Sequence, residues 1–183
     1  MKLLCGESSV KIKIAKIDDI VEIKNLMICA IEKLQTHYLT SEQILASHSS
    51  MGLDTQLIED GTYFCVWKEN QIIGCGGWSF RQTLYGGNHS VGRNAERLDP
   101  NSDRARIRAM YTHPAHIRQG VGSLILKTAE QAAASAGFKS FEMAATLAGE
   151  PLYARHGYKI ESRWLNENGP VPIPLLTMVK LGM

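Results

Sequence analysis

The N-terminal part of the chain begins with an alternating segment and continues with a helical one. Apolar and charged residues alternate over Val10–Lys16, which is the pattern of a half-buried strand, and we place this strand at or near a sheet edge. Apolar residues recur at helical spacing over Ile20–Leu34, which predicts a helix. Asp18 and Asp19 just before it supply its cap. The pattern therefore predicts an edge strand followed by an amphipathic helix.

The next segment carries a helix-start signal and then two strand signals. Thr-Ser-Glu-Gln, beginning at Thr40, resembles a capping box and predicts a short helix over Glu42–Ser47. A loop over Ser49–Gly61 follows. Thr62–Lys68 and Ile72–Phe80 are aromatic and β-branched runs separated by a polar turn, so they predict two antiparallel central strands.

The second half of the chain places its longest helix after a long loop. Arg81–Arg104 shows little periodicity, and both a functional and a disordered loop are open interpretations. Ala105–Thr112 is another strand, which Pro114 prevents from continuing. Apolar spacing predicts a helix over Gly120–Ala136, with Gly137 as its left-handed cap. The remaining elements predicted are a strand over Lys139–Leu147, a short helix over Pro151–His156, and strands over Tyr158–Leu165 and Ile173–Leu181.

Two glycines mark the start of the long helix. Gly120 and Gly122 flank Val121 in the stretch HPAHIRQGVGS. Glycine lets the backbone approach an anion closely, and the free N–H groups and positive dipole of a helix N-terminus favour a phosphate. A glycine pair on its own more often marks a plain helix start than a ligand loop. The stretch therefore indicates a candidate phosphate site, and a second motif elsewhere in the chain is needed to support it.

Composition limits the class of protein. The 183 residues suit one domain spanning residues 1–183. Twenty basic against 18 acidic residues give a net charge of +2, which predicts neither a nucleic-acid surface nor an anionic-membrane surface. We therefore expect a small molecule as the partner.

Cysteine spacing and the N-terminus bear on the compartment. The four cysteines lack zinc-site spacing, so we expect reduced thiols and no metal. Met1–Glu7 does not resemble a secretory signal, and no apolar run approaches the roughly 18 residues of a membrane span. We expect a cytoplasmic protein without membrane association. The cysteines are Cys5, Cys29, Cys65 and Cys75.

A second motif lies at a fixed distance from the glycine pair. The strand ending at His113-Pro114, the RQGVGS turn, the long helix, the next strand and PLYARHGY over Pro151–Tyr158 together resemble the GNAT superfamily of acetyl-coenzyme A dependent N-acetyltransferases. The resemblance implies one α/β domain (mixed α+β) with a mixed, mostly antiparallel sheet of about seven strands and helices on both faces. It also implies a splay between the fourth strand, Ala105–Thr112, and the fifth, Lys139–Leu147.

The resemblance implies that acetyl-CoA is the acetyl donor, bound through its pyrophosphate at the glycine loop. Ile117 departs from the Gln or Arg usual in the family at this position, and Arg118 is either its replacement or a solvated charge. The residues implied to contact the coenzyme are Met110, Tyr111, Thr112, Ile117, Arg118, Gln119, Gly120, Val121, Gly122, Ser123 and Thr146.

The resemblance also assigns the chemistry. A primary amine attacks the thioester directly, and Tyr153 matches the family tyrosine that protonates the departing thiolate; packing on the short helix is the alternative role. The strand before the glycine loop carries no carboxylate, so the base is either Glu142 or a water relay. We expect His113 and His116 to be structural.

The end of the second hairpin strand is predicted to face the acceptor. Core packing and solvated charges are the alternatives there, and Arg81 and Arg108 are candidates to meet an acceptor carboxylate. The residues predicted to line this pocket are Trp78, Phe80, Arg81, Tyr85 and Arg108. Cys75 has no basic neighbour to activate it, whereas Gly76 and Gly77 indicate a bulge or close approach to a ligand.

Several alternatives are open at this point. The acceptor can be a polyamine, aminoglycoside, amino acid, peptide N-terminus or lysine side chain, although the net charge disfavours a strongly cationic one. A homodimer through Ile173–Leu181 is possible. A non-catalytic acyl-CoA sensor of the same fold is the first alternative function. A nucleotide-binding protein is a distant one, because Ile125 occupies the place of a third glycine.

Overall fold

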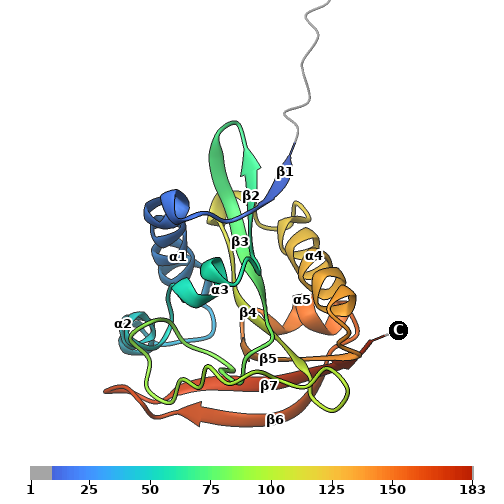
Figure 1. The fold of residues 1–183 in the computed structure, drawn as a ribbon. Helices are drawn as coiled ribbons and strands as arrows, with labels where there is room; N and C mark the ends of the chain where they lie inside the picture. Colours follow the sequence, from blue (N-terminus) through green and yellow to red (C-terminus); the bar gives the residue numbers. More distant parts are fainter. Residues whose placement is uncertain (1–9, 183) are drawn as a thin grey trace, which may run out of the picture.

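Seven strands form one sheet, in the order β1-β2-β3-β4-β5-β7-β6, in the computed structural model, which describes residues 10–182 (Figure 1). Every neighbouring pair is antiparallel except the parallel pair β4–β5. The elements are β1 (Lys11–Ile14), η1 (Ile17–Asp19), α1 (Ile20–Leu34), α2 (Ser41–Ser50), α3 (Thr55–Glu59), β2 (Tyr63–Lys68), β3 (Gln71–Ser79), β4 (Ala105–Thr112), η2 (Pro114–His116), α4 (Val121–Ser135), β5 (Ser140–Thr146), α5 (Glu150–Arg155), β6 (Lys159–Asn166) and β7 (Ile173–Leu181). The predicted mixed, mostly antiparallel sheet is confirmed.

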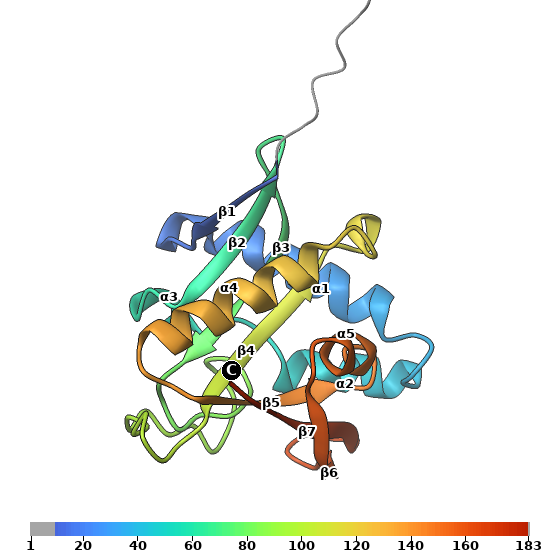
Figure 2. The ribbon, with the colours of Figure 1, turned by 90° about the vertical axis from the view of Figure 1, so that its right-hand side faces the viewer.

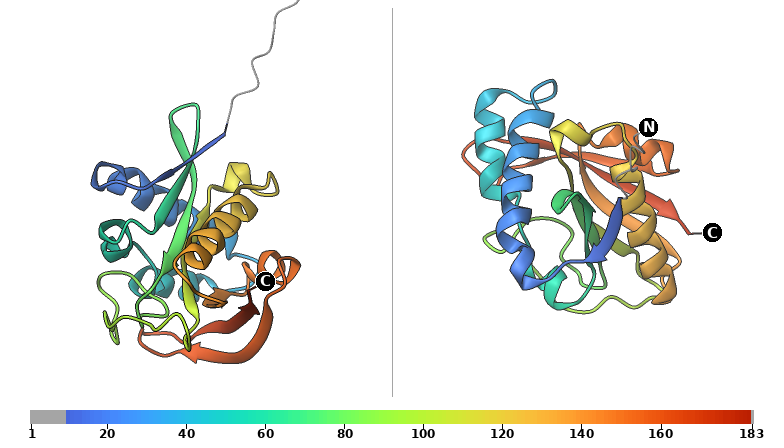
Figure 3. Two further views of the ribbon diagram at one scale, coloured as in Figure 1. Left: turned by 45° about the vertical axis from the view of Figure 1, so that its right-hand side comes forward. Right: turned by 90° about the horizontal axis from the view of Figure 1, so that it is seen from above.

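Helices cover both faces of this sheet. Seen from above in Figure 3, α1 and α2 lie on one side and α4 on the other. In Figure 1, β2 to β4 run nearly upright, whereas β5, β7 and β6 lie across the foot of the molecule. The sheet is therefore strongly twisted, and its two halves meet at the β4–β5 pair.

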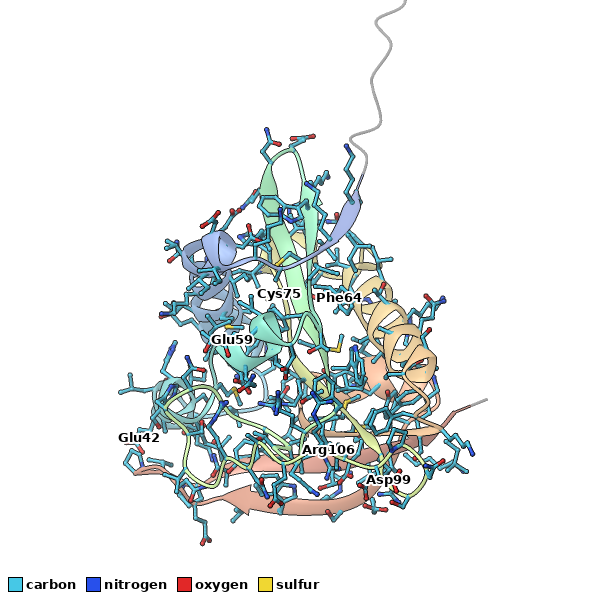
Figure 4. The ribbon with its side chains drawn as sticks, viewed as in Figure 1. Glu42, Glu59, Phe64, Cys75, Asp99 and Arg106 are labelled. Carbon is cyan, nitrogen blue, oxygen red and sulfur yellow. The ribbon has the colours of Figure 1, made fainter. Side chains whose placement is uncertain are left out.

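Two apolar cores follow from the helical periodicity. On α1, every third or fourth residue is buried, and Ile23, Leu26 and Met27 pack with Cys65 and Cys75 of the sheet. Figure 4 labels Cys75 within the sheet. On α4, small residues face the opposite core, which lets the helix lie close to the strands. The buried residues of α4 are Val121, Ile125, Leu126, Ala129 and Ala133.

The predicted loop over Ser49–Gly61 was wrong, because it contains helix α3. Asp54 caps this helix by accepting a hydrogen bond from the Gln56 amide (3.2 Å), and Leu57 and Ile58 are buried against α1. Five residues are too few for periodicity to reveal a helix. The capping box that begins at Thr40 is present.

The predicted cap of α1 was also wrong. Neither Asp18 nor Asp19 caps α1 through its side chain, because both lie in the 3₁₀ turn η1. The Asp19 carboxylate instead accepts a hydrogen bond from the Lys16 amide (2.8 Å), which closes that turn.

The long segment between β3 and β4 folds back on itself. Leu98 donates its amide to the Phe80 carbonyl (2.8 Å), and Thr83 and Asn94 are joined by main-chain and side-chain hydrogen bonds. Leu98 is also buried in the core. The segment is therefore an ordered excursion from the sheet, which settles the alternative left open for it.

The glycines of β3 make room for protein. Of the two interpretations of Gly76 and Gly77, close approach to a ligand was wrong, whereas the β3–β4 register is irregular between Cys75 and Gly77, as expected for a bulge. A Cβ on Gly74 would lie 2.4 Å from Val121 of α4, and one on Gly76 would lie 2.9 Å from Ile125. A Cβ on Gly77 would lie 2.1 Å from the Thr62 carbonyl oxygen. These positions let α4 and β2 approach β3 closely.

The last strand is paired on both sides within the chain. β7 lies between β5 and β6, so its pairing partner is not a second copy.

Replacing Gly77 by alanine tests the close packing at β3. We expect Gly77→Ala to lower the free energy of unfolding by about 2–3 kcal/mol, because the new methyl group would overlap main-chain atoms that cannot move aside. Urea denaturation followed by circular dichroism measures the change. The control is Gly169→Ala, where the nearest atom to a Cβ is Ser49 Oγ at 3.4 Å. Equal losses in the two variants would show that the contact at Gly77 is unimportant.

Candidate functional site

The parallel strands β4 and β5 separate soon after they begin to pair. They are paired only at Ala105–Phe141 and Arg106–Glu142, and the following residues of both strands line a cavity of about 710 Å³. Figure 2 shows β4 running away from β5. The splay predicted between the fourth and fifth strands is therefore present, and a cavity lies within it.

A bulge in β4 lies inside this opening. Cys75 pairs with Tyr111 and Gly77 with Arg108, so β4 carries one residue more than β3 across this interval. Ala109 lies there in the left-handed conformation (φ 49°), and the buried Tyr63 hydroxyl donates to its carbonyl oxygen (2.7 Å). A bulge bends a strand and increases its twist. Gly76 and Gly77 indicated a bulge in this part of the sheet, but the extra residue lies on β4, where Ala109 is not a glycine and carries no such signal.

The glycine loop presents unpaired amide groups to the cavity. Gly120 is left-handed (φ 84°) and precedes the first residue of α4, and Arg118 is left-handed too (φ 61°). The first amide to bond back is that of Leu124, which donates to the Gly120 carbonyl (2.9 Å). Within residues 10–182, the amides of Val121 to Ser123 have no acceptor. This arrangement is suited to binding an anion.

The two glycines of the motif have different roles. Gly120 has no atom within 4 Å of a hypothetical Cβ, so its backbone conformation alone requires glycine. A Cβ on Gly122 would lie 2.9 Å from Leu152 of α5. Gly122 therefore serves mainly the packing of α4 against α5.

Side chains of the loop that precedes α4 hold its shape. His113 Nδ1 accepts from the Ala115 amide (3.2 Å), and Gln119 donates to the Ala115 carbonyl (3.1 Å) and lies 3.3 Å from His116 Nδ1. Partial burial lowers the pKa of His113. These contacts fit the structural role expected for both histidines. Gln119, predicted to contact the coenzyme, is directed into the loop and does not line the cavity.

Tyr153 faces the same cavity from α5. It is 8 % exposed, and burial raises the pKa of its phenol to about 12. A Cβ on Gly149 would lie 2.7 Å from its ring, so this glycine makes room for it. No residue in the described part of the chain hydrogen-bonds its hydroxyl group. α5 is joined to the glycine loop by His156 Nε2 and Ser123 Oγ, 2.9 Å apart.

All residues predicted to contact the coenzyme line the cavity, with the exception of Gln119. They are Met110, Tyr111, Thr112, Ile117, Arg118, Gly120, Val121, Gly122, Ser123 and Thr146.

Three residues predicted for the acceptor pocket lie elsewhere, which corrects that prediction. Trp78 is buried in the core with its ring edge-on to Phe80 and Phe138, at 5.8 Å between centroids in each case. Arg81 forms an ion pair with Asp60 (2.7 Å). None of the three borders the cavity, because Trp78 and Phe80 pack into the core beneath α4 and Arg81 is held by Asp60.

Tyr85 does lie at the cavity wall, as predicted. Its hydroxyl donates to Asn166 Oδ1 and accepts from Asn168 Nδ2, both at 2.9 Å. Its ring is edge-on to Trp164, with centroids 5.3 Å apart. The tyrosine is therefore fixed by the region at the end of β6.

Arg108 also borders the cavity, but its guanidinium is paired within the protein. It donates to Asp54 (3.0 Å) and to the carbonyls of Thr83 and Gly86 (2.8 Å each), and Arg108 and Asp54 are both 2 % exposed. Arg93 binds the other oxygen of Asp54 (2.7 Å). Burial lowers the pKa of Arg108, and the Asp54 carboxylate opposes this effect. Arg108 was predicted to bind a carboxylate of the acceptor, but its guanidinium is already bound within the protein and has a structural role.

Glu142 does not reach the cavity, which corrects its nomination as a base. It pairs with Arg106, the residue opposite it in the β4–β5 pair and labelled in Figure 4. A carboxylate neutralised by a guanidinium is a poor base. No aspartate or glutamate of the described chain lines the cavity.

The described cysteines are free thiols, and the described residues hold neither a metal-ligand cluster nor a membrane-spanning helix. Cys29, Cys65 and Cys75 are free thiols, whereas Cys5 and the Met1–Glu7 segment lie outside the described residues. Burial raises the pKa of Cys75 to about 12, so this thiol is not an activated nucleophile. Residues 10–182 contain no cluster of three or more potential metal ligands. They also contain no helix long and apolar enough to span a membrane.

Comparison with known proteins finds one family. The sequence model of the acetyltransferase (GNAT) family matches residues 29–158, well over half of the chain. A curated relative, the uncharacterized N-acetyltransferase YjcF of Bacillus subtilis, is 23% identical over 152 residues, which cover 81% of this chain and 93% of the relative.

Solved structures share the fold. A GCN5-related N-acetyltransferase structure from Rhodopseudomonas palustris has a TM-score of 0.68 at 15% identity, covering 99% of both chains. PaiA N-acetyltransferase from Thermoplasma acidophilum, solved with coenzyme A, has a TM-score of 0.64 at 12% identity, covering 94% of this chain and 99% of its own. YncA from Salmonella typhimurium, solved with acetyl-CoA, has a TM-score of 0.63 at 15% identity, covering 95% of this chain and 94% of its own.

The buried Asp54 carboxylate gives a test of the site's framework. We expect Asp54→Asn to lower the free energy of unfolding by about 3–5 kcal/mol, because it leaves the buried Arg108 without its counter-ion. Urea denaturation at neutral pH measures it. Glu161→Gln is the control, because its ion pair with Arg104 is largely exposed and should contribute less than about 1 kcal/mol. Similar losses in both variants would contradict a special role for Asp54.

Proposed function

Because the chain belongs to the acetyltransferase (GNAT) family, we propose that it transfers an acetyl group from acetyl-coenzyme A to a primary amine. The observation that carries this proposal is the row of amides at Val121 to Ser123, which have no acceptor within residues 10–182. These amides border a cavity that Tyr153 also lines. An anion-binding loop and a proton donor on one cavity are the two requirements of the reaction.

The loop and the open strand edge fit the coenzyme. The amides of Val121, Gly122 and Ser123 bind its pyrophosphate, with the positive end of α4 behind them. Arg118 and Arg155 add positive charge at the cavity wall. Beyond Arg106, β4 has no strand partner on its β5 side, so its backbone is available to the amide groups of the pantetheine arm.

Acetyl-CoA supplies an activated acyl group whose leaving group is a thiolate. Tyr153 donates its phenolic proton to the sulfur as the carbon–sulfur bond breaks. Burial raises the pKa of Tyr153 to about 12, which alone would make it a weak acid toward an ordinary thiolate. Burial disfavours a thiolate for the same reason, so a sulfur that leaves in this buried part of the cavity is a stronger base than it is in water.

Water is the base in this scheme. The cavity wall holds no carboxylate within the described residues, and Glu142 is paired with Arg106. The attacking amine therefore loses its protons to water, before and after the new carbon–nitrogen bond forms. This leaves Tyr153 as the one side chain for which we propose a proton transfer.

Removing the phenol tests its role as an acid. We expect Tyr153→Phe to lower kcat by about 10²-fold while leaving acetyl-CoA affinity unchanged, because only the proton donor is lost. With a pKa of about 12, Tyr153 stays protonated across the assay range, so activity should not fall between about pH 7 and 10 in the native protein. Steady-state rates over that range, followed by thiol release, check both statements.

The outcome also separates the alternative function. Undiminished turnover by Tyr153→Phe would remove the acid role. Binding of acetyl-CoA by the native protein, with no transfer to any of a broad set of amines, would favour a non-catalytic acyl-CoA sensor.

The glycine loop is tested by a matched pair of variants. We expect Gly120→Ala to raise the Kd for acetyl-CoA about tenfold, because alanine strains the left-handed conformation that aims the amides. Gly92→Ala is the control: Gly92 is also left-handed (φ 79°), also has nothing within 4 Å of a Cβ, and lies away from the cavity. Calorimetric titration measures both, with NAD as a second ligand. Equal changes in Kd, or binding of NAD alone, would refute the proposed site.

A further inference from the structure

The cavity has a second half, on the face of the sheet that carries α1 and α2. Most of its wall is apolar or aromatic, with Gln35, Ser50 and Arg108 as further lining residues, and we call it the acceptor half. It lies across the sheet from α4 and α5, which carry the glycine loop amides and Tyr153. The residues that define it are Ile31, Leu34, Tyr38, Met51, Leu84 and Tyr85.

The wall of the acceptor half is held firmly. Tyr85 is fixed by two asparagine side chains, and Met51 Sδ accepts a hydrogen bond from Gln35 (3.6 Å). The amide of Asn88 donates to the Leu53 carbonyl (2.9 Å), which joins the Leu84–Gly86 turn to the segment after α2. This half is therefore a preformed apolar surface rather than a loose loop.

Among residues 10–182, the only charged side chain on this wall is a cation. Arg108 lies at its base, and Asp54, the carboxylate behind it, is shared with Arg93. Two guanidinium groups and one carboxylate give this cluster a net charge of +1, with Arg108 and Asp54 buried and the Arg93 side chain 26% exposed. The remaining ionisable groups on the cavity wall are tyrosines, Arg118, Arg155 and His116. The described part of the chain thus offers no counter-ion to a cationic ligand in this cavity.

We propose that the acceptor is a monoamine with an apolar or aromatic body, and that amines carrying a second cationic group are excluded. This specificity rests on the proposed acetyl transfer. A second ammonium group would be buried on an apolar wall beside a cationic cluster, and an unpaired buried charge is costly. A single amine avoids this cost, because it must be neutral in order to react.

The cluster also favours the reactive form of that amine. Nearby positive charge lowers the pKa of a bound ammonium group, so the neutral amine is favoured without a carboxylate base. Its lone pair then forms a bond to the thioester carbonyl carbon, the carbon–sulfur bond breaks with its electron pair on sulfur, and Tyr153 protonates the sulfur. The new amide nitrogen releases one proton to water, which restores the tyrosine. The products are the N-acetylated amine and the free thiol.

Two amines of equal length test the proposal. Hexylamine and 1,6-diaminohexane differ only in a second amine, and we expect kcat/KM to be at least about tenfold higher for hexylamine. 2-Phenylethylamine should be accepted as well. Thiol release at pH 8 measures all three with the full-length native protein. A diamine used as well as hexylamine would overturn the proposal.

A designed carboxylate provides the matched variant. Leu84→Glu puts a counter-ion on the wall of the acceptor half and should shift the ratio of rates toward the diamine by about tenfold. Leu45→Glu is the control, because Leu45 is 74 % exposed on α2 and lies outside the cavity. Thermal denaturation confirms that each variant is folded. A ratio that moves equally in both variants would contradict the assignment of the wall.

Failure of this inference differs from failure of the proposed function. If acetyl-CoA binds but no amine is acetylated, the proposed function is wrong, and the acceptor class is wrong with it. If hexylamine and the diamine are acetylated equally well, the acetyltransferase function stands and only the acceptor class is wrong.

Discussion

The pairing between β4 and β5 stops after Arg106–Glu142, and every part of the candidate site depends on where it stops. Three residues later, Ala109 forms a left-handed bulge whose carbonyl is held by the buried Tyr63 hydroxyl. A bulge bends its strand, so it adds to the separation of β4 from β5 that begins after Arg106. The separation creates the cavity and leaves one edge of β4 without a strand partner. Had the ladder continued, its own backbone hydrogen bonds would have filled the space that a ligand can occupy.

The position of the anion-binding loop follows from the close packing of α4 on the sheet. Gly74 and Gly76 of β3 leave no Cβ in the way of Val121 and Ile125, so the first turn of α4 lies against the strands. Gly120 then turns the chain through a conformation that few other residues adopt. The amides of the loop reach the cavity because α4 packs closely on the sheet and because Gly120 adopts the left-handed conformation. The glycines of β3 therefore support the ligand site without forming part of it.

Local patterns predicted most helices and strands well, because these depend on neighbours in sequence, whereas the splayed sheet was implied by the family resemblance. The period of α4, the alternation in β1 and the glycine motif were readable from a few adjacent residues. The site was predicted only in part, since its polar partners are far apart in the chain. Glu142 and Arg108 were nominated by type and position, but their roles depend on Arg106 and on Asp54, 54 positions before Arg108. Asp54 itself lies in a segment that showed no periodicity.

The orientation of Asp54 has a consequence for the chemistry of the cavity. Its two oxygens are bound by Arg93 and Arg108, so its negative charge is neutralised there and does not face the cavity. The same carboxylate facing the cavity would pair with an ammonium ion and raise the pKa of that amine, holding it in the unreactive form. Burial likewise raises the pKa of Tyr153 and keeps its proton in place. One apolar, carboxylate-free environment thus favours a neutral nucleophile and a protonated acid together, and it does so without a dedicated base.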